Sequence, residues 1–124
     1  MAETAVAVTT LTAGTVSADL VTNAEGGTSV SAGDTAVINV ENVTDTVIVS
    51  FYASSAATAT AVAGDYPLAV RSGLGNGTAQ TLPAADVVIA VYDASRYMHD
   101  DGKIRILIGS NTTVVGAHRI PKTI

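Results

Sequence analysis

The segment from Gly33 to Tyr52 constrains the fold most strongly, because apolar residues occupy every second position over two short runs. These alternating residues are Ala36, Ile38 and Val40 in the first run, and Val47, Val49 and Phe51 in the second. Successive side chains of a β-strand point to opposite faces, so a period of two places such a set on one buried face. No stripe with a helical period competes with this pattern. The segment therefore predicts two short strands joined by a polar corner.

Similar patterns recur along the chain, with turn residues between them. We expect further strands over 4–11, 16–21, 58–62, 66–70, 78–82, 87–92, 103–108 and 113–120, with one helical turn over 94–97. The run 87–92 is apolar on both faces, which is typical of a central strand covered on both sides. In 103–108 the residues Ile104, Ile106 and Ile108 alternate, so they are expected to face the core.

Eight or so short strands with turn signals between them predict an all-β fold. We expect a single antiparallel β-sandwich, Ig-like or jelly-roll-like, in which residues 1–124 form one domain. Residues 1–12 would contribute a first strand or an extended N-terminal arm. No βαβ pattern, linker or repeat divides the chain.

The apolar content of the chain favours a core built from small side chains. Hydrophobic residues make up 48% of the 124 residues, mostly as Ala and Val, whereas aromatic residues make up 4%. Because burial contributes about 0.8 kcal/mol per CH₂, small side chains give a thin core. Covering more surface in an oligomer would stabilise such a domain, so the composition is a first indication of assembly.

Charge is distributed unevenly along the chain, whose net charge is −5. All six Lys and Arg residues lie at or after Arg71, whereas every charged residue before it is acidic. This asymmetry could orient the domain against a charged partner, or it could be scattered surface charge. No basic cluster alternates with aromatic residues, so we do not expect nucleic acid as a partner.

The chain contains no Cys, which excludes disulfides and thiolate metal sites. Its first residues include Glu3 where a signal peptide has positive charge, and Thr residues interrupt their apolar run. We therefore expect neither a signal peptide nor a membrane partner, and we expect synthesis in the cytoplasm.

The densest polar cluster runs from His99 to Gly102, with Asp93 upstream. Its carboxylates could suit Ca²⁺, but their spacing departs from that of the EF-hand loop, and Asp before Gly is also typical of a tight turn. His99 and His118 without any thiol are too few for a zinc site. No Gly-x-Ser-x-Gly or Gly-Lys-Ser/Thr motif occurs. We therefore expect no catalytic, cofactor-binding or metal-binding residues.

Arg96, Tyr97 and Met98 belong to residue types that occur often at protein interfaces, although a Tyr closing the end of a sandwich is ordinary packing. The two ends of the chain lack strong turn residues and could reach neighbouring molecules, or simply fray. The predicted contact residues are Val6, Val8, Arg96, Tyr97, Met98 and Arg119.

The linear order of these features resembles that of small all-β virion proteins of tailed bacteriophages. The pieces that carry the resemblance are Gly33-Asp34-Thr35 through Asn42, the second apolar strand, Leu82-Pro83-Ala84-Ala85-Asp86, the apolar strand to Tyr92, Ser95-Arg96-Tyr97, Asp101-Gly102-Lys103-Ile104-Arg105 and Ala117-His118-Arg119-Ile120-Pro121. They cover the chain from Gly33 to its end, and the Ala/Thr-rich segment 53–63 departs from the pattern. Within this group the chain resembles capsid decoration (cement) proteins.

The resemblance implies a structural virion protein that binds the outer surface of a phage capsid and stabilises it by bridging major capsid subunits. The major capsid protein would be its partner, with self-association on the lattice, for example as a trimer. No cofactor, catalytic activity, membrane or nucleic acid would be involved. The protein would be made in the host cytoplasm and located on the capsid exterior of the virion.

Two other functions stay open. A tail, fibre or adhesin-type sandwich that binds a cell-surface glycan would need an aromatic-lined groove, which the scarce aromatic residues disfavour. A small hydrolase would need a pocket in which a Ser or Asp meets His99 or His118.

Overall fold

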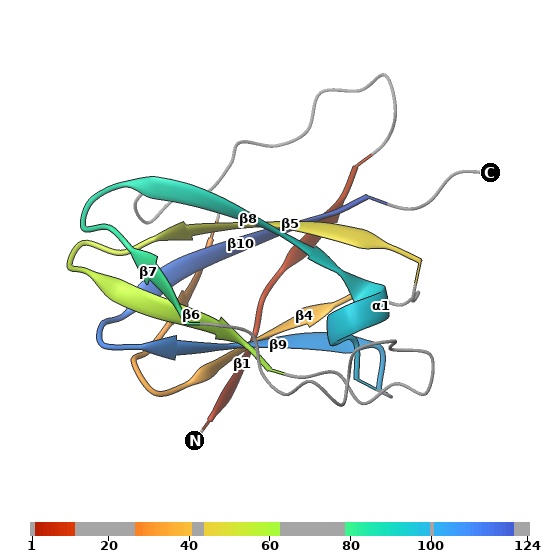
Figure 1. Ribbon diagram of the computed structural model, residues 1–124, viewed down its shortest axis with the longest axis horizontal. Helices are drawn as coiled ribbons and strands as arrows, with labels where there is room; N and C mark the ends of the chain where they lie inside the picture. Colours follow the sequence, from red (N-terminus) through yellow and green to blue (C-terminus); the bar gives the residue numbers. More distant parts are fainter. Residues whose placement is uncertain (1, 12–26, 41–43, 63–78, 100, 121–124) are drawn as a thin grey trace.

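Two β-sheets pack face to face in the computed structural model (Figure 1), which describes residues 2–11, 27–40, 44–62, 79–99 and 101–120. Sheet A has the strand order β1 (Glu3–Ala5), β4 (Thr35–Asn39), β9 (Lys103–Gly109), β6 (Ala57–Ala61) and β7 (Gln80–Leu82). Sheet B has the order β2 (Val8–Thr10), β10 (Thr113–Ile120), β5 (Thr46–Tyr52) and β8 (Val87–Asp93), and β3 (Thr28–Val30) also pairs with β10. One helical turn, α1 (Ala94–Tyr97), follows β8 directly. The predicted all-β sandwich is confirmed.

The sandwich differs from the prediction in the number and direction of its strands. The described residues form ten strands rather than the eight or so expected, and both sheets are mixed rather than purely antiparallel. β1 pairs in parallel with β4, and β2 pairs in parallel with β10. Both parallel pairs involve the N-terminal segment. The sequence did not predict them, because alternation indicates a strand without specifying which strand it pairs with.

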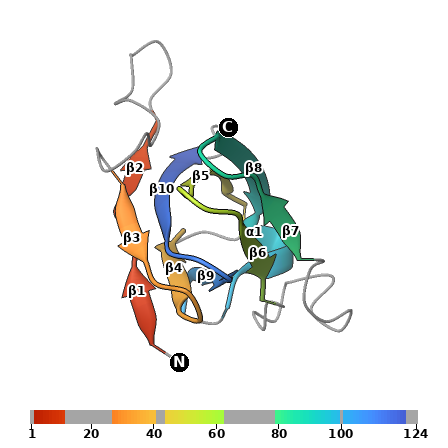
Figure 2. The ribbon, with the colours of Figure 1, turned by 90° about the vertical axis from the view of Figure 1, so that its left-hand side faces the viewer.

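The N-terminal segment crosses from one sheet to the other along the side of the sandwich where β3 also lies (Figure 2). Between β1 and β2, the backbone N–H of Val6 donates to the carbonyl of Val37 at 2.9 Å. Beyond β2, the N–H of Leu11 donates to the carbonyl of Arg119 at 2.9 Å. The strand expected over 4–11 is therefore split into β1, which belongs to sheet A, and β2, which belongs to sheet B.

Most other expected elements lie where the sequence pattern predicts them. β10 coincides with the predicted 113–120, β5 with the second alternating run, and α1 with the predicted helical turn. The strands expected over 16–21 and 66–70 lie outside the described residues. The turn before β4 contains Gly33 at a φ of 88°, a conformation that favours glycine. Among the described residues, no helix is long and apolar enough to cross a membrane.

The strand predicted over 87–92 is present as β8, but it lies at an edge of sheet B and not in its centre. Its ladder with β5 is continuous, from Thr46 opposite Asp93 to Tyr52 opposite Val87. Within the part of the chain that the structure describes, no strand pairs with the other edge of β8. The prediction of a central, fully covered strand was wrong. The outward-facing side chains of β8 are apolar, as in a covered strand, but they are exposed.

Side chains from both sheets meet in one core. The largest fully buried side chains are Phe51, Ile38, Ile104, Ile106, Ile108, Val30, Val40, Val47, Val49, Val115 and Thr113. The three isoleucines of β9 face inward as predicted. Alanines fill much of the remaining space, among them Ala36, Ala57, Ala59, Ala61 and Ala117. The core is aliphatic and built mostly from small side chains, as the composition suggests.

Candidate protein-binding surface

The outer face of sheet B carries a row of exposed apolar side chains on β8. Val87 is 38% exposed, Ile89 is 53% exposed and Val91 is 62% exposed. Single exposed aliphatic residues are common on protein surfaces, but a contiguous apolar patch marks a place where another molecule binds. This row is therefore the first candidate for a contact site.

The apolar row continues across the sheet, because the register places residues of β5 and β10 on the same face. We call this set of side chains the apolar face: Ile48, Tyr52, Val87, Ile89, Val91, Val114 and Ile120. Ser50, Gly116 and His118 lie between them on the same face, and all three are buried. Ile48, Tyr52 and Val114 are half-buried, and Ile120 is exposed. The carboxylate on this face is that of Asp93, which accepts a hydrogen bond from the Thr46 hydroxyl at 3.3 Å.

The outer face of sheet A is polar instead. The register places on it the side chains of Glu3, Asn39, Thr58, Thr60, Thr81, Lys103 and Arg105. Its aliphatic side chains, Val37 and Leu107, are buried and half-buried respectively. One outer face of the sandwich is thus polar, and the other carries the exposed apolar row of β8.

A charged cluster crosses the polar face from β9 to β1. The Arg105 guanidinium donates from Nε to Glu3 Oε2 at 2.7 Å and from Nη2 to Asp101 Oδ2 at 2.7 Å. The hydrogen bonds from Arg105 hold the pKa of Asp101 below its usual value. In the ladder, Val37 of β4 lies between Ala5 and Arg105, so the pair with Glu3 spans β4 and fastens β1 to β9. The cluster is engaged within the fold rather than held ready for a partner.

The inner side of β8 borders two hollows at the side of the sandwich where β8 and β7 lie (Figure 2). The larger, of about 230 Å³, is lined by alanines of β6 and β8 together with Gln80, Tyr92 and Tyr97. The smaller, of about 150 Å³, lies beside Phe51 and Leu82. Neither lining includes a His, Ser, Asp or Glu side chain, so neither is the pocket in which a Ser or Asp would meet His99 or His118.

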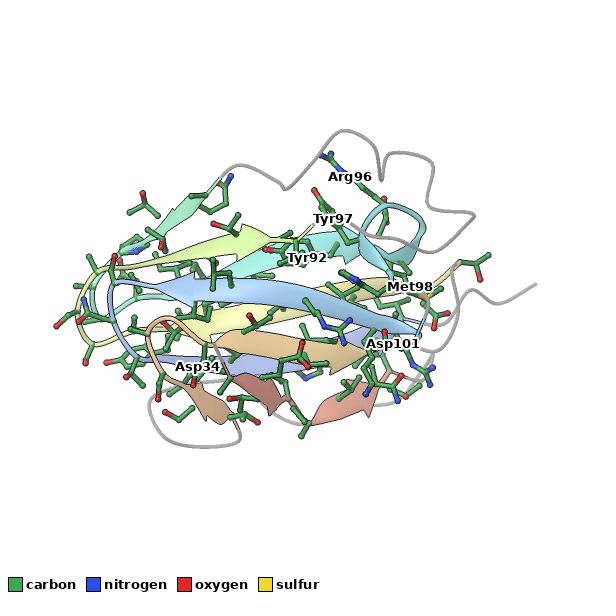
Figure 3. All side chains as sticks on the ribbon, turned by 90° about the horizontal axis from the view of Figure 1, so that it is seen from below. Asp34, Tyr92, Arg96, Tyr97, Met98 and Asp101 are labelled. Atoms are coloured by element: carbon green, nitrogen blue, oxygen red, sulfur yellow. The ribbon has the colours of Figure 1, made fainter. Side chains whose placement is uncertain are left out.

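Tyr92 and the residues that follow it form a cluster beside the larger hollow (Figure 3). The rings of Tyr92 and Tyr97 meet edge to face with centroids 5.6 Å apart, and the Arg96 guanidinium lies 4.9 Å from the Tyr97 centroid. Tyr92 is buried, and this burial, together with the nearby Tyr97, raises its pKa to about 12. The cluster closes one end of the sandwich, which is the ordinary packing role considered for Tyr97 above.

At alkaline pH the fold is expected to lose stability through Tyr92. Its pKa rises from 10.0 to about 12 on folding, so between these values the unfolded chain loses the proton and the folded chain keeps it. The contribution of Tyr92 to the free energy of unfolding is therefore constant below the unfolded pKa. It decreases by about 2 to 3 kcal/mol as the pH rises from the unfolded pKa to the folded pKa. Tyr92→Phe should remove this part of the pH dependence, measured by urea unfolding across the alkaline range. Tyr52→Phe in the same sheet is the matched control, and an equal effect of both changes would contradict the assignment to Tyr92.

The structure separates the six residues predicted as lattice contacts. Val6 is 6% exposed and Met98 is 2% exposed, so both belong to the core and neither is available on the surface. Val8, Arg96 and Tyr97 are half-buried. Val8 lies on β2, far along the sheet order from β8, whereas Arg96 and Tyr97 follow β8 directly.

Arg119, the sixth predicted contact residue, is engaged inside the fold. Its guanidinium donates to Asp45 Oδ2 at 3.4 Å, to the Val40 carbonyl at 3.3 Å and to the Thr10 hydroxyl at 2.9 Å. These partners come from β2, from the residue after β4 and from the residue before β5. Arg119 therefore joins the two sheets at one end of the sandwich.

Of the polar residues considered as a cation site, Asp100 lies outside the described residues, and the described carboxylates have other partners. Asp101 pairs with Arg105, and Asp93 accepts from Thr46. The described residues contain no group of three or more His, Cys, Asp or Glu side chains that could hold a metal ion. His118 lies on β10, opposite Ile48, and is 5% exposed. It is therefore mostly buried on the outer side of sheet B, and it lines neither hollow.

The exposed residues of β8 are the part of this surface that sequence reasoning missed. The run between Asp86 and Asp93 did indicate a strand, and its composition suggested two buried faces. The same sequence pattern also fits an edge strand whose outer face is exposed. Only the sheet order distinguishes an edge strand from a central one.

Comparison of the chain with models of protein families, with curated proteins and with solved structures gives no match.

Proposed function

We propose that this chain is a structural virion protein of the capsid-decoration kind, which binds the outer surface of a phage capsid and bridges neighbouring major capsid subunits. The observation that carries the proposal is the difference between its two outer faces. The face of sheet B carries the exposed apolar row of β8, continued by half-buried apolar side chains of β5 and β10 beside the buried Ser50 and His118. The face of sheet A instead carries Thr, Lys, Arg and Glu side chains. A sandwich with one apolar face suits attachment to a broad protein surface, with the polar face toward solvent.

On a repeated capsid lattice, a contact surface of modest affinity is sufficient for stable attachment. Many copies on a symmetric shell are bound together, so a modest affinity per copy gives a large total effect when one copy contacts two subunits. The apolar face also has few charges that a partner would need to match. Capsid decoration of this kind needs a rigid scaffold and a contact surface, and it does not need a catalytic group.

The amount of the chain in purified virions tests the proposal directly. Quantitative mass spectrometry should find hundreds of copies per particle, and the purified chain should sediment with heads that lack it. Few copies per particle would favour a tail or connector component instead. Absence from the virion would remove the proposal altogether.

The side of attachment is tested by a matched pair of substitutions. Val91→Lys places a charge on the apolar face, and Thr81→Lys places the same charge on an exposed strand position of the polar face. Val91→Lys should weaken co-sedimentation with heads by about tenfold or more, because a buried unpaired charge at a contact costs more than about 1.4 kcal/mol. Thr81→Lys should bind as the unchanged chain does. Equal loss in both variants would contradict attachment through sheet B.

Glycan binding by a tail, fibre or adhesin module is a second candidate function. One observation favours it: Tyr92 and Tyr97 border the larger hollow. However, Tyr92 is buried, and the Arg96 guanidinium already lies against the Tyr97 ring. Little free aromatic surface is left for a sugar to stack on, so capsid attachment remains the better supported function.

A further inference from the structure

The outer edge of β8, with which no strand of the described residues pairs, lacks the features by which edge strands usually avoid pairing with another chain. β8 is seven residues long and contains no Pro, Lys or Arg. Its ladder with β5 runs without a skipped residue, so no bulge bends it away. Its charged residue, Asp93, is the last one of the strand. A long, apolar and regular edge is a template for adding one more strand.

The sequence of β8 matches itself when a second copy runs antiparallel to it. In a dimer with a two-fold axis perpendicular to the sheet, the outer faces of the two copies lie on the same side. Directly opposed residues point to the same face, so the axis must pass between two copies of the same residue. With the axis at Ile89, Val87 lies opposite Val91 of the second copy, and the two Ile89 side chains lie opposite each other. All three exposed residues of the row then have aliphatic neighbours across the new ladder.

The neighbouring registers are less favourable. An axis at Ala90 would place Val87 opposite Asp93. An axis at Val88 would place Val91 opposite Ala85, which lies before β8 begins. With the axis at Ile89, the ladder runs from residue 86 to residue 92 in both copies. It stops where each chain turns away, at Ala85 with its φ of 62° and at the start of α1.

Charge and facing side chains also fit a second copy. In the Ile89 register Asp93 lies opposite Ala85 of the second copy and Asp86 lies opposite Tyr92, so no carboxylate is placed directly opposite another. Toward the inner side, Val88 lies opposite the small Ala90 of the second copy. Pairing uses the backbone edge of β8 and leaves the apolar face open on its outer side, where it joins the same face of the second copy.

We propose that two copies of this chain dimerise by antiparallel pairing of their β8 strands about Ile89, which joins the two B sheets into one continuous sheet. This inference goes beyond the capsid-decoration proposal and does not depend on it. The dimer is measured on the purified chain without heads, so dimerisation without head binding would overturn only the proposed function. Head binding by a monomeric chain would overturn only the dimer.

The absence of native Cys makes single-cysteine cross-linking a clean test of the register. Opposed residues of an antiparallel pair have Cβ atoms about 5 Å apart, whereas residues four positions out of register are displaced by about 13 Å. A short thiol-specific cross-linker should therefore join Ile89→Cys to itself almost completely. Val87→Cys alone and Val91→Cys alone should react little, but a mixture of the two should give a cross-linked dimer. Thr81→Cys on the polar face is the control for random collision.

Light scattering coupled to size exclusion completes the test. The unchanged chain should have twice the protomer mass, with the dimer fraction rising with concentration. Ile89→Lys should remain folded by circular dichroism, because Ile89 is 53% exposed, and should be a monomer. A monomeric unchanged chain, a trimer, or an Ile89→Cys variant that cross-links no better than Thr81→Cys would overturn the proposal.

Discussion

Replacing Arg119 with methionine is expected to lower the free energy of unfolding by about 3 to 5 kcal/mol, because it leaves a buried carboxylate without its cation. Asp45 is 4% exposed, and its Oδ2 lies 3.4 Å from Arg119 Nη1. The same guanidinium donates to the Val40 carbonyl and the Thr10 hydroxyl, so three segments lose a donor together. Methionine keeps much of the aliphatic stem, which limits the change to the polar head. Urea unfolding of the two proteins measures the difference.

A double variant separates the unpaired charge from other losses. Asp45→Asn in the Arg119→Met background removes the uncompensated charge, so it should recover a large part of the lost stability. A double variant no more stable than Arg119→Met alone would show that lost packing causes the effect. Arg119→Met that keeps its stability but loses binding to heads would support the sequence-based expectation that Arg119 is a lattice contact.

Phe51→Ala is expected to have a destabilising effect of similar size, about 3 to 5 kcal/mol. Phe51 is the single Phe of the chain and is 2% exposed near the end of β5, opposite Val88 and Val115. Its neighbours in the core are mostly small side chains held on paired strands, so they cannot move far enough to fill the space. Because a domain of this size has a total stability of about 5 to 15 kcal/mol, the loss should be plain in thermal and urea unfolding.

The adjacent residue provides a matched control for the Phe51 variant. Tyr52 lies next to it on the same strand, points to the outer face and is half-buried. Tyr52→Ala removes a similar ring from the apolar face, where solvent can fill the vacated volume, so it should cost about 1 kcal/mol. Equal losses for the two variants would contradict a core confined to the space between the sheets.

Much of the fold follows from local patterns that the sequence carries openly. Alternation predicted β5, β9 and β10 close to their observed limits, and the helical turn expected over 94–97 is present as α1. The inward orientation of Ile104, Ile106 and Ile108 also follows, because side-chain direction in a strand has a fixed period of two. The absence of Cys and the scarcity of aromatic residues bounded the kinds of site that the chain can build.

The sequence by itself therefore determined which segments are strands and which side of most of them is buried. The tertiary structure alone decided which strands are neighbours. In that structure the N-terminal segment forms a parallel strand in each sheet, and β8 lies at an edge of sheet B. Arg119 forms an ion pair with Asp45. The physical reason is that side-chain alternation is a local property of the backbone, whereas strand order depends on hydrogen bonds and packing between residues far apart in the chain. The row of Val87, Ile89 and Val91 is exposed because of that strand order, which places β8 at an edge of sheet B.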